Sequence, residues 1–294
     1  NAAKASADFN IVCRLVDESS GLTVLRLPAM EASLETGAAR DFTVPQAVLE
    51  NPRLWHFDHP GLYRIEACLV KDGRPVHSLA DTFGVRRFEV RGTEFLLNGE
   101  PVRLMGVERM GGSHPLYGMA EPEELIRRDH AEMKELNCVF SRVHWQQDRR
   151  VLDWCDRNGI LIQIEVPCWG PATFNGMGDR LDPVIMANGL EQLEEMIRRD
   201  SNHPSVVTWG LCNEIDGQNP VAAEFARRMY ERARELDPGR LLTYASNSLQ
   251  KDPGTDISRM MDFVEWNEYY ESWMEGTPAD MRRNLEAIHA AFPD

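Results

Sequence analysis

The sequence predicts a multidomain protein in which an all-β sandwich is followed by an incomplete α/β barrel. Residues up to about 87 contain short runs of alternating apolar and polar residues separated by turn segments, which is typical of a sandwich. From Phe95 onward, strongly apolar runs alternate with amphipathic segments, which indicates a parallel sheet with helices outside it. The 294 residues suffice for two domains, one of them a barrel of typical size.

The first domain, expected at 1–87, is predicted to be an immunoglobulin-like β-sandwich. Residues 9–16 alternate in character as a strand with one buried face does. The segments 17–21 and 71–75 are rich in turn-forming residues and separate such strands. There is room for about six strands, one fewer than the usual seven of this fold. The first edge strand is therefore expected to be missing.

The second domain, expected at 88–294, is predicted to be part of a (β/α)8 barrel of the TIM type. Its predicted strands are 103–107, 138–143, 160–166, 206–212, 241–245 and 262–266. Its predicted helices are 122–136, 148–158, 184–200, 220–236 and 278–291. A closed barrel needs eight strands, so about six βα units of an incomplete barrel are predicted.

Proline and glycine mark the ends of several predicted helices. Pro122 and Pro220 stand at helix starts, where a missing backbone N–H costs nothing. Asn158-Gly159 closes another helix in the expected way. An open, doubly wound sheet is the alternative to a barrel, but no glycine-rich phosphate loop follows the first strand. Polar and aromatic residues instead follow nearly every strand, which favours the barrel.

Composition narrows the choice of partners and cofactors. The net charge of −15 argues against nucleic acid as a partner, because phosphate binding needs a basic face. No apolar run is long enough to span a membrane. The eight histidines contain no HxH or HExxH pattern, so no metal site is predicted. A neutral or small-molecule substrate fits the charge, and no cofactor is expected.

The cysteines have no CxxC pairing and no metal-finger spacing. The six are Cys13, Cys68, Cys138, Cys155, Cys168 and Cys212. The last four lie in the second domain, where reduced core thiols are expected, whereas Cys13 and Cys68 could bridge the sandwich. No signal peptide is visible, and together with the scattered cysteines this favours a cytoplasmic location, which otherwise stays open.

The run 202–214 carries the strongest functional signal. A charged helix stops at Asn202-His203-Pro204, and the β-branched strand that follows ends in Asn213-Glu214. A carboxyl group at the C-terminal end of a buried parallel strand lies where barrel enzymes place their chemistry. Glu214 can move a proton while Asn213 donates a hydrogen bond to a substrate hydroxyl, as the acid/base strand of a glycosidase requires. A strand that simply ends in a polar turn is the alternative.

Several further motifs appear in the order found in one enzyme family. They are Leu54-Trp55 with Pro60-Gly61-Leu62-Tyr63, residues 81–90, residues 95–102 with Gly106-Val107, residues 155–161, Glu165-Val166-Pro167 and finally 202–214. Together they resemble glycoside hydrolase family 2, the group of β-galactosidases, β-glucuronidases and β-mannosidases. The resemblance covers almost the whole chain. It implies a fragment that lacks the family's N-terminal sugar-binding domain and its last two barrel strands.

The resemblance implies a retaining β-glycosidase that hydrolyses terminal β-glycosidic bonds, with β-galactosidase as the first expectation. Glu214 would be the general acid/base, and Asn213 would bond the sugar 2-hydroxyl. A retaining enzyme needs a second carboxylate about 5–5.5 Å from the first. In this family it comes from the seventh strand, so the nucleophile is expected beyond Asp294, and this chain alone is expected to be inactive.

The segment 265–270 is similar to the family's N-x-YY motif. On that match Asn267 and Tyr269 would be pocket residues, with Tyr269 orienting the nucleophile. Glu268 lies between them and is the alternative nucleophile within this chain.

The sequence departs from the family after two strands. Members often carry N-[RK]-HE after the first barrel strand, where this chain has Glu108-Arg109-Met110. After the second strand the family's Arg and His are separated by two residues, whereas Arg142 and His144 are separated by one. Arg142 would hold the acidic cluster together and His144 would reach the sugar. The alternative is an Arg paired with Glu165 and a His in a hydrogen-bonded loop.

Three tryptophans follow predicted strands of the barrel, namely Trp145, Trp169 and Trp273. Their faces could stack on a sugar, although tryptophan also commonly packs a barrel rim. Some β-galactosidases of the family bind Mg²⁺ near the acid/base, but no His-rich or carboxylate-rich site is evident in this sequence.

Two other function classes remain open. A non-catalytic carbohydrate-binding or scaffold protein is favoured by the missing His after the first strand, while the intact Asn213-Glu214 pair counts against it. A barrel hydrolase with an endo-acting cleft is disfavoured by the attached sandwich. A six-strand barrel would expose apolar strand edges, which predicts a homo-oligomer or disorder near the C-terminus.

Overall fold

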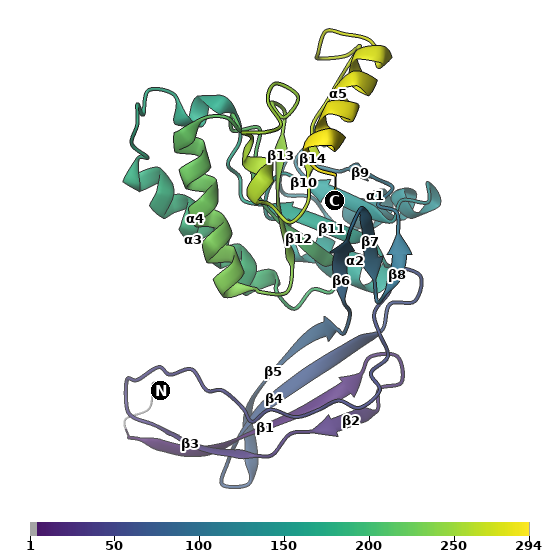
Figure 1. Cartoon of the computed structure of the whole chain (residues 1–294). Helices are drawn as coiled ribbons and strands as arrows, with labels where there is room; N and C mark the ends of the chain where they lie inside the picture. The colour runs from purple at the N-terminus through teal and green to yellow at the C-terminus, as the bar shows by residue number, and fades with distance from the viewer. Residues whose placement is uncertain (1–4, 294) are drawn as a thin grey trace. The chain divides into compact units, whose positions relative to one another are not determined.

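Residues 5–293 are described by the computed structural model, and the chain divides into two compact units (Figure 1). The first unit runs to Arg86 and takes in Asn202–Pro204, and the second unit begins at Arg87 and holds the rest. This division falls next to the boundary predicted at 87–88. Each unit has its own hydrogen-bonded sheet.

The first unit is built on one antiparallel sheet in the order β2-β1-β4-β5, with β3 also paired to β1. Its strands are β1 (Ala7–Asp17), β2 (Thr23–Arg26), β3 (Met30–Leu34), β4 (Leu62–Lys71) and β5 (Arg74–Gly84). Ile11, Cys13 and Leu15 are buried and alternate with more exposed residues, so β1 buries one face. Five strands form, where the sequence predicted about six.

The strands β2 and β3 occupy the same edge of β1, one after the other. Pro28 lies between them and has no N–H to donate to a ladder, which suits a break at this point. In the segment that follows β3, Phe42 packs edge-on against Phe9 of β1, with ring centroids 5.8 Å apart. Cys13 on β1 and Cys68 on β4 are free thiols, so the bridge considered from the sequence is not formed.

The second unit contains a parallel sheet of six strands in chain order, β9 to β14 (Figure 1). The strands are β9 (Gly106–Glu108), β10 (Phe140–Val143), β11 (Leu161–Glu165), β12 (Val206–Asn213), β13 (Leu241–Ser246) and β14 (Glu265–Trp266). Every strand predicted for the barrel is found, and strictly sequential order is what a (β/α) barrel requires. Strand β14 is shorter than predicted, since the Asp262 carboxylate accepts the Leu242 N–H at 2.7 Å.

Helices connect these strands and cover the outside of the sheet (Figure 1). They are α1 (Glu123–Glu135), α2 (Arg149–Asn158), α3 (Pro183–Asp200), α4 (Pro220–Leu236) and α5 (Pro278–Ala291), with short 3₁₀ turns η1 (Pro171–Phe174) and η2 (Ile257–Met260). Gly159 ends α2 in the left-handed conformation, as predicted. Pro220 opens α4, but Pro122 is the N-cap of α1 and not its first helical residue. Among the described helices, none has the length and apolar character that crossing a membrane requires.

A small antiparallel sheet precedes the barrel strands. It is formed by β6 (Phe88–Arg91), β7 (Glu94–Leu97) and β8 (Glu100–Val102). The turn between β7 and β8 is Asn98-Gly99, and both residues have positive φ, as a tight hairpin turn needs. Phe95 stands edge-on to Phe263 at 5.1 Å, which ties this sheet to the segment before β14.

The core of the second unit lies between the parallel sheet and its helices. All residues of β11 and β12 are buried. Trp209 of β12 is fully buried, donates its indole N–H to Asp237 at 3.0 Å and carries the Arg240 guanidinium over its ring. Neither face of such strands is open to solvent, which is why the sequence shows them as predominantly apolar runs.

Gly210 gives β12 the space that the neighbouring Glu165 needs. A Cβ atom at Gly210 would lie 2.0 Å from Cγ of the fully buried Glu165. The glycine therefore lets a glutamate of β11 lie flat across the adjacent strand.

We predict that Gly210→Ala lowers the free energy of unfolding by about 1–3 kcal/mol, because the added methyl group must displace Glu165. Urea unfolding followed by circular dichroism measures this. Gly239→Ala is the matched control, since the nearest atom to its Cβ lies 3.6 Å away. An unchanged stability of Gly210→Ala would show that Glu165 does not pack against β12.

Candidate active site

Charged and polar side chains collect at the C-terminal ends of the parallel strands. They are Glu108 on β9, Arg142 and His144 on and after β10, Gln163 and Glu165 on β11, Asn213 and Glu214 at the end of β12, and Glu265 and Asn267 on and after β14. Because the strands are parallel, their carboxyl ends meet at one end of the sheet, which is where barrel enzymes carry their active sites.

The guanidinium of Arg142 is the centre of this group. Its Nε and Nη2 atoms donate to the two carboxylate oxygens of Glu165, at 2.6 and 3.1 Å. Nη2 also donates to Oδ1 of Asn213 at 2.8 Å, and Nη1 donates to Oε1 of Glu108. Burial opposes the charge, but the carboxylates of Glu165 and Glu265 hold the pKa of Arg142 above its usual range. Arg142 is therefore a permanent cation that joins its own strand, β10, to β9, β11 and β12.

A second carboxylate, Glu265, lies close to Glu165 inside the sheet. The amide of Gln163 donates to Oε1 of Glu165 at 2.9 Å and to Oε2 of Glu265 at 3.0 Å. Thr208 donates to the oxygen of that amide and so fixes its orientation. Burial raises the pKa of Glu265 to about 7, with Arg142 opposing the shift and the charge of Glu165 adding to it. This carboxyl group therefore titrates near neutral pH.

Glu214 is held in a strained conformation at the end of β12. Its φ is 54°, in the left-handed region that a residue with a side chain rarely adopts. An irregularity in the pairing with β13 lies just before it, between Gly210 and Asn213. The carboxylate is fixed from two sides, by Trp169 Nε1 donating to Oε2 at 3.2 Å and by Asn267 Nδ2 donating to Oε1 at 2.8 Å.

The side-chain amide of Asn213 has hydrogen-bond partners at its oxygen but, among residues 5–293, none at its nitrogen. Its Oδ1 accepts hydrogen bonds from Arg142 at 2.8 Å and from Asn267 at 2.9 Å, and these two donors settle which end of the amide is oxygen. Its Nδ2 is buried and finds no acceptor among residues 5–293. A buried donor without a partner costs about 1–3 kcal/mol, and a ligand hydroxyl would remove that cost.

Aromatic side chains stand around this carboxylate and amide. Trp169 is 65% exposed, and its chain segment runs along β12, where Gly170 N donates to the Asn213 carbonyl at 3.0 Å. Burial, and then the charges of Glu108 and Glu214, raise the pKa of Tyr269. Tyr269 in turn packs on the exposed ring of Trp273, with centroids 4.7 Å apart.

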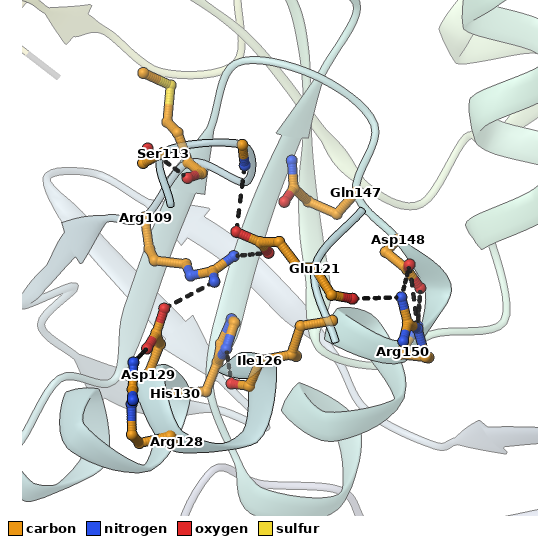
Figure 2. Close-up of polar contacts among 12 residues, drawn as sticks. Arg109, Ser113, Glu121, Ile126, Arg128, Asp129, His130, Gln147, Asp148 and Arg150 are labelled. Atoms are coloured by element: carbon orange, nitrogen blue, oxygen red, sulfur yellow. Dashed lines mark hydrogen bonds and ion pairs between the residues drawn. The ribbon is translucent and has the colours of Figure 1, made fainter. Parts of the chain in front are cut away.

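The loop after β9 is anchored on the other side of its strand (Figure 2). Arg109 donates from Nη1 to Glu121 at 2.7 Å and from Nη2 to Asp129 at 2.8 Å, and Figure 2 shows it between these two carboxylates. Glu121 also accepts from the backbone N–H of Gly112 at 3.2 Å, and its carbonyl accepts from Arg150 at 3.0 Å. These bonds close the loop at its base and fix the end of β9.

Hydrogen bonds link seven of the residues singled out in the sequence into one network. They are Arg142, His144, Glu165, Trp169, Asn213, Glu214 and Asn267. Trp145 contacts this group only through the edge of His144, at 6.4 Å between ring centroids. Glu268 accepts from the backbone N–H of Tyr270 at 3.3 Å, and none of the described bonds joins it to Asn213 or Glu214.

Sequence reasoning missed Gln163 and the structural role of Glu265. Gln163 and Glu165 alternate with apolar residues in β11, so both point to the same face of the sheet. That period of two was the available signal. Arg142 pairs with Glu165, as one interpretation held, and the same guanidinium also bonds to Glu108 and lies 4.0 Å from Glu265, as expected of a residue that holds an acidic cluster together.

Two family models match the chain and together cover nearly all of it. The model for "Glycosyl hydrolases family 2" matches residues 2–86, and the model for "Glycosyl hydrolases family 2, TIM barrel domain" matches residues 88–292. The matches confirm the predicted class, a sandwich domain followed by an incomplete barrel.

Individual relatives carry the names of two glycosidases. The β-glucuronidase of Bacteroides fragilis is 30% identical over 305 residues, which span 99% of this chain and 42% of that protein. The β-galactosidase of Thermoanaerobacter pseudethanolicus is 34% identical over 201 residues, or 67% of this chain and 25% of that protein. The crystal structure of Bacteroides uniformis β-glucuronidase superposes with a TM-score of 0.86 at 28% identity, covering 100% of this chain and 36% of that one. The chain thus spans less than half the length of each.

We predict that Glu265 makes the free energy of unfolding fall as pH rises from about 4.5 to about 7, an effect that the buried His130 opposes, because burial lowers its pKa. The pKa of Glu265 is raised from 4.5 to about 7, so the folded state binds the proton more tightly than the unfolded state. Its contribution is complete below pH 4.5, is lost as pH rises through 7, and amounts to at most about 3 kcal/mol.

Urea unfolding at pH 5, 6, 7 and 8 measures this slope, and Glu265→Gln is expected to flatten it, because an amide does not titrate. Glu191→Gln, on the outer helix α3, is the control and should keep the wild-type slope. An equal slope in Glu265→Gln and the wild type would contradict the prediction.

Proposed function

Because the chain belongs to glycosyl hydrolase family 2, we propose that it carries the acid/base half of the active site of a retaining β-glycosidase. Glu214 is the general acid/base, and Asn213 donates a hydrogen bond to the sugar 2-hydroxyl. The observation that carries the proposal is the buried, unpartnered Nδ2 of Asn213 beside a carboxylate that Trp169 and Asn267 orient.

The geometry suits a carboxyl group that first gives and then takes a proton. In the first step the protonated Glu214 passes its proton to the glycosidic oxygen as the bond to the leaving group breaks. In the second step its carboxylate removes a proton from the water that releases the sugar. Two N–H donors on opposite oxygens fix the plane of the carboxyl group, so the proton is transferred along one direction.

The nucleophile of this mechanism is a second carboxylate about 5–5.5 Å from the first. Glu165 does not fit that role, because it is fully buried and both of its oxygens bond to Arg142. Glu265 bonds to Gln163 within the same polar cluster. We place the nucleophile on a further barrel strand that would follow β14 in the sheet.

We propose that the substrate is a β-galactoside, so that the glycone is galactose, with a β-glucuronide as the second candidate. The name of the Thermoanaerobacter relative supports the first, and the names of the two Bacteroides relatives favour the second. A carbohydrate-binding protein without turnover would present the same Asn213 and Trp169, so turnover separates that alternative from an enzyme. An absence of cofactors and a cytoplasmic location stay predictions.

We predict that Glu214→Gln, in the full-length protein, lowers kcat for a nitrophenyl β-glycoside by at least about 10²-fold, because glutamine cannot transfer a proton. The loss in kcat/KM, which reports the first step, should be smaller for a dinitrophenyl glycoside, whose leaving group departs without protonation. Steady-state kinetics on both substrates measure the difference.

Glu191→Gln on the outer face of α3 serves as the matched control and should keep wild-type kinetics. Wild-type turnover by Glu214→Gln would remove Glu214 from the mechanism. An equal loss in kcat/KM with both leaving groups would assign it a role other than acid catalysis in the first step.

We also propose that the 294-residue chain, studied on its own, associates with a second copy through an exposed edge of the parallel sheet, which further barrel strands would cover in the full-length protein. Strands β9 and β14 end the sheet, and Met105 and Val107 at the β9 edge are 57% and 41% exposed. We expect a dimer in size-exclusion chromatography with light scattering, and a monomer for Val107→Lys. A monomeric wild type would refute the proposal.

A further inference from the structure

Glu108 is turned toward the inside of the active site by the residue that follows it. Consecutive side chains of a strand point to opposite faces. Arg109 is bonded to Glu121 and Asp129 on the side of α1, where Figure 2 shows it. Glu108, the last residue of β9, therefore faces the opposite way, and its carboxylate meets Arg142.

Only one oxygen of the Glu108 carboxylate is engaged. Oε1 accepts from Nη1 of Arg142 and lies 3.3 Å from Nε2 of His144. Oε2 takes part in none of the bonds described for residues 5–293. The side chain is 38% exposed, whereas that of Glu165 on the same guanidinium is fully buried. Glu108 thus offers one oxygen to a ligand.

Glu108 is an acceptor and not a donor at neutral pH. The hydrogen bond with His144 and the charge of Arg142 hold the pKa of Glu108 below its usual range, against the effect of burial. An ionised carboxylate can only accept hydrogen bonds. Its complement on a sugar is a hydroxyl group.

Arg142 does not need Glu108 to stay in place. Two bonds to Glu165 and one to Asn213 already hold its guanidinium. The bond to Glu108 is the one formed at the exposed side of this cluster, so it fits a role in orienting Glu108 better than a role in holding Arg142.

We propose that Glu108 is a specificity-determining residue, whose carboxylate accepts a hydrogen bond from a hydroxyl of a neutral sugar in the glycone pocket. This rests on the proposed function and names the substrate class of that site. Glu108 and Asn213 bond to the same guanidinium of Arg142, and Asn213 directly precedes Glu214, which places Glu108 close to the proposed acid/base. A uronate carboxylate close to Glu108 would meet its negative charge, because the charge of Arg142 is already shared by Glu165.

The test uses the full-length protein and combines one substitution in the protein with the removal of single hydroxyl groups from the sugar. Nitrophenyl β-galactopyranoside is compared with its four monodeoxy analogues on the wild type and on Glu108→Ala. Apart from the 2-deoxy analogue, whose missing hydroxyl is the one proposed to bond to Asn213, we expect one analogue to lose at least about tenfold in kcat/KM with the wild type, as the loss of a hydrogen bond to a charged group implies. On Glu108→Ala that same analogue and the parent sugar should react alike. Glu108→Gln, which retains an acceptor oxygen, should restore part of the difference.

If Glu108 only held Arg142 in place, the kinetics of the five substrates would follow a different pattern. Glu108→Ala would then slow all five substrates by the same factor and leave every deoxy penalty in place, which would overturn the proposal. Glu191→Ala is the matched control and should leave all penalties unchanged. Faster cleavage of nitrophenyl β-glucuronide than of the galactoside by the wild type would overturn the assignment of a neutral sugar.

These outcomes separate the two proposals. If the wild type cleaves the parent galactoside and no penalty depends on Glu108, only the role of Glu108 fails. If it cleaves neither glycoside, the proposed function fails, and the role of Glu108 falls with it.

Discussion

The buried guanidinium of Arg142 is the interaction on which the catalytic end of the sheet depends. It stands on β10 and bonds to Glu108 of β9, Glu165 of β11 and Asn213 of β12. Leaving a buried charge without its partner costs about 3–5 kcal/mol, so neither Arg142 nor Glu165 is free to change alone. The ends of four neighbouring strands are thereby fixed by charge as well as by backbone hydrogen bonds. Every other polar group at this end takes its position from that arrangement.

The strain at Glu214 is one consequence of this rigidity. A left-handed backbone at a residue with a side chain costs about 1–3 kcal/mol and persists only where the surroundings enforce it. Here the preceding Asn213 is tied to Arg142, and the backbone N–H of Glu214 donates to Ala245 of β13 at 2.8 Å. With Trp169 and Asn267 on its carboxylate, Glu214 has little freedom to relax. The contacts of the buried cluster thus keep the strained backbone of Glu214 in place and fix the orientation of its carboxyl group.

The sequence predicted the parts of this structure that depend on local pattern. Buried parallel strands have no face open to solvent and are therefore rich in apolar residues. These apolar runs located all six barrel strands to within a few residues. Asn213 and Glu214 stood out because they end such a run. The bond from Gln163 to Glu265 was out of reach, because it joins strands far apart in the chain and depends on the curvature of the sheet. The one-residue error at Pro122 arose because proline is tolerated both as N-cap and as first helical residue.

The chain departs from the family pattern at the end of β9, where its surroundings can accommodate a change. Glu108 bonds to Arg142 at the exposed side of the polar cluster, while Glu165 and Asn213 hold the same guanidinium from within. The ion pairs of Arg109 with Glu121 and Asp129 fix the end of β9 and keep Glu108 facing inward. A change at Glu108 therefore leaves the fully buried contacts of Arg142 in place, whereas a change at Glu165 does not. Under the role proposed for Glu108, the choice of sugar can vary there while the acid/base machinery stays fixed, because the two are held by different contacts.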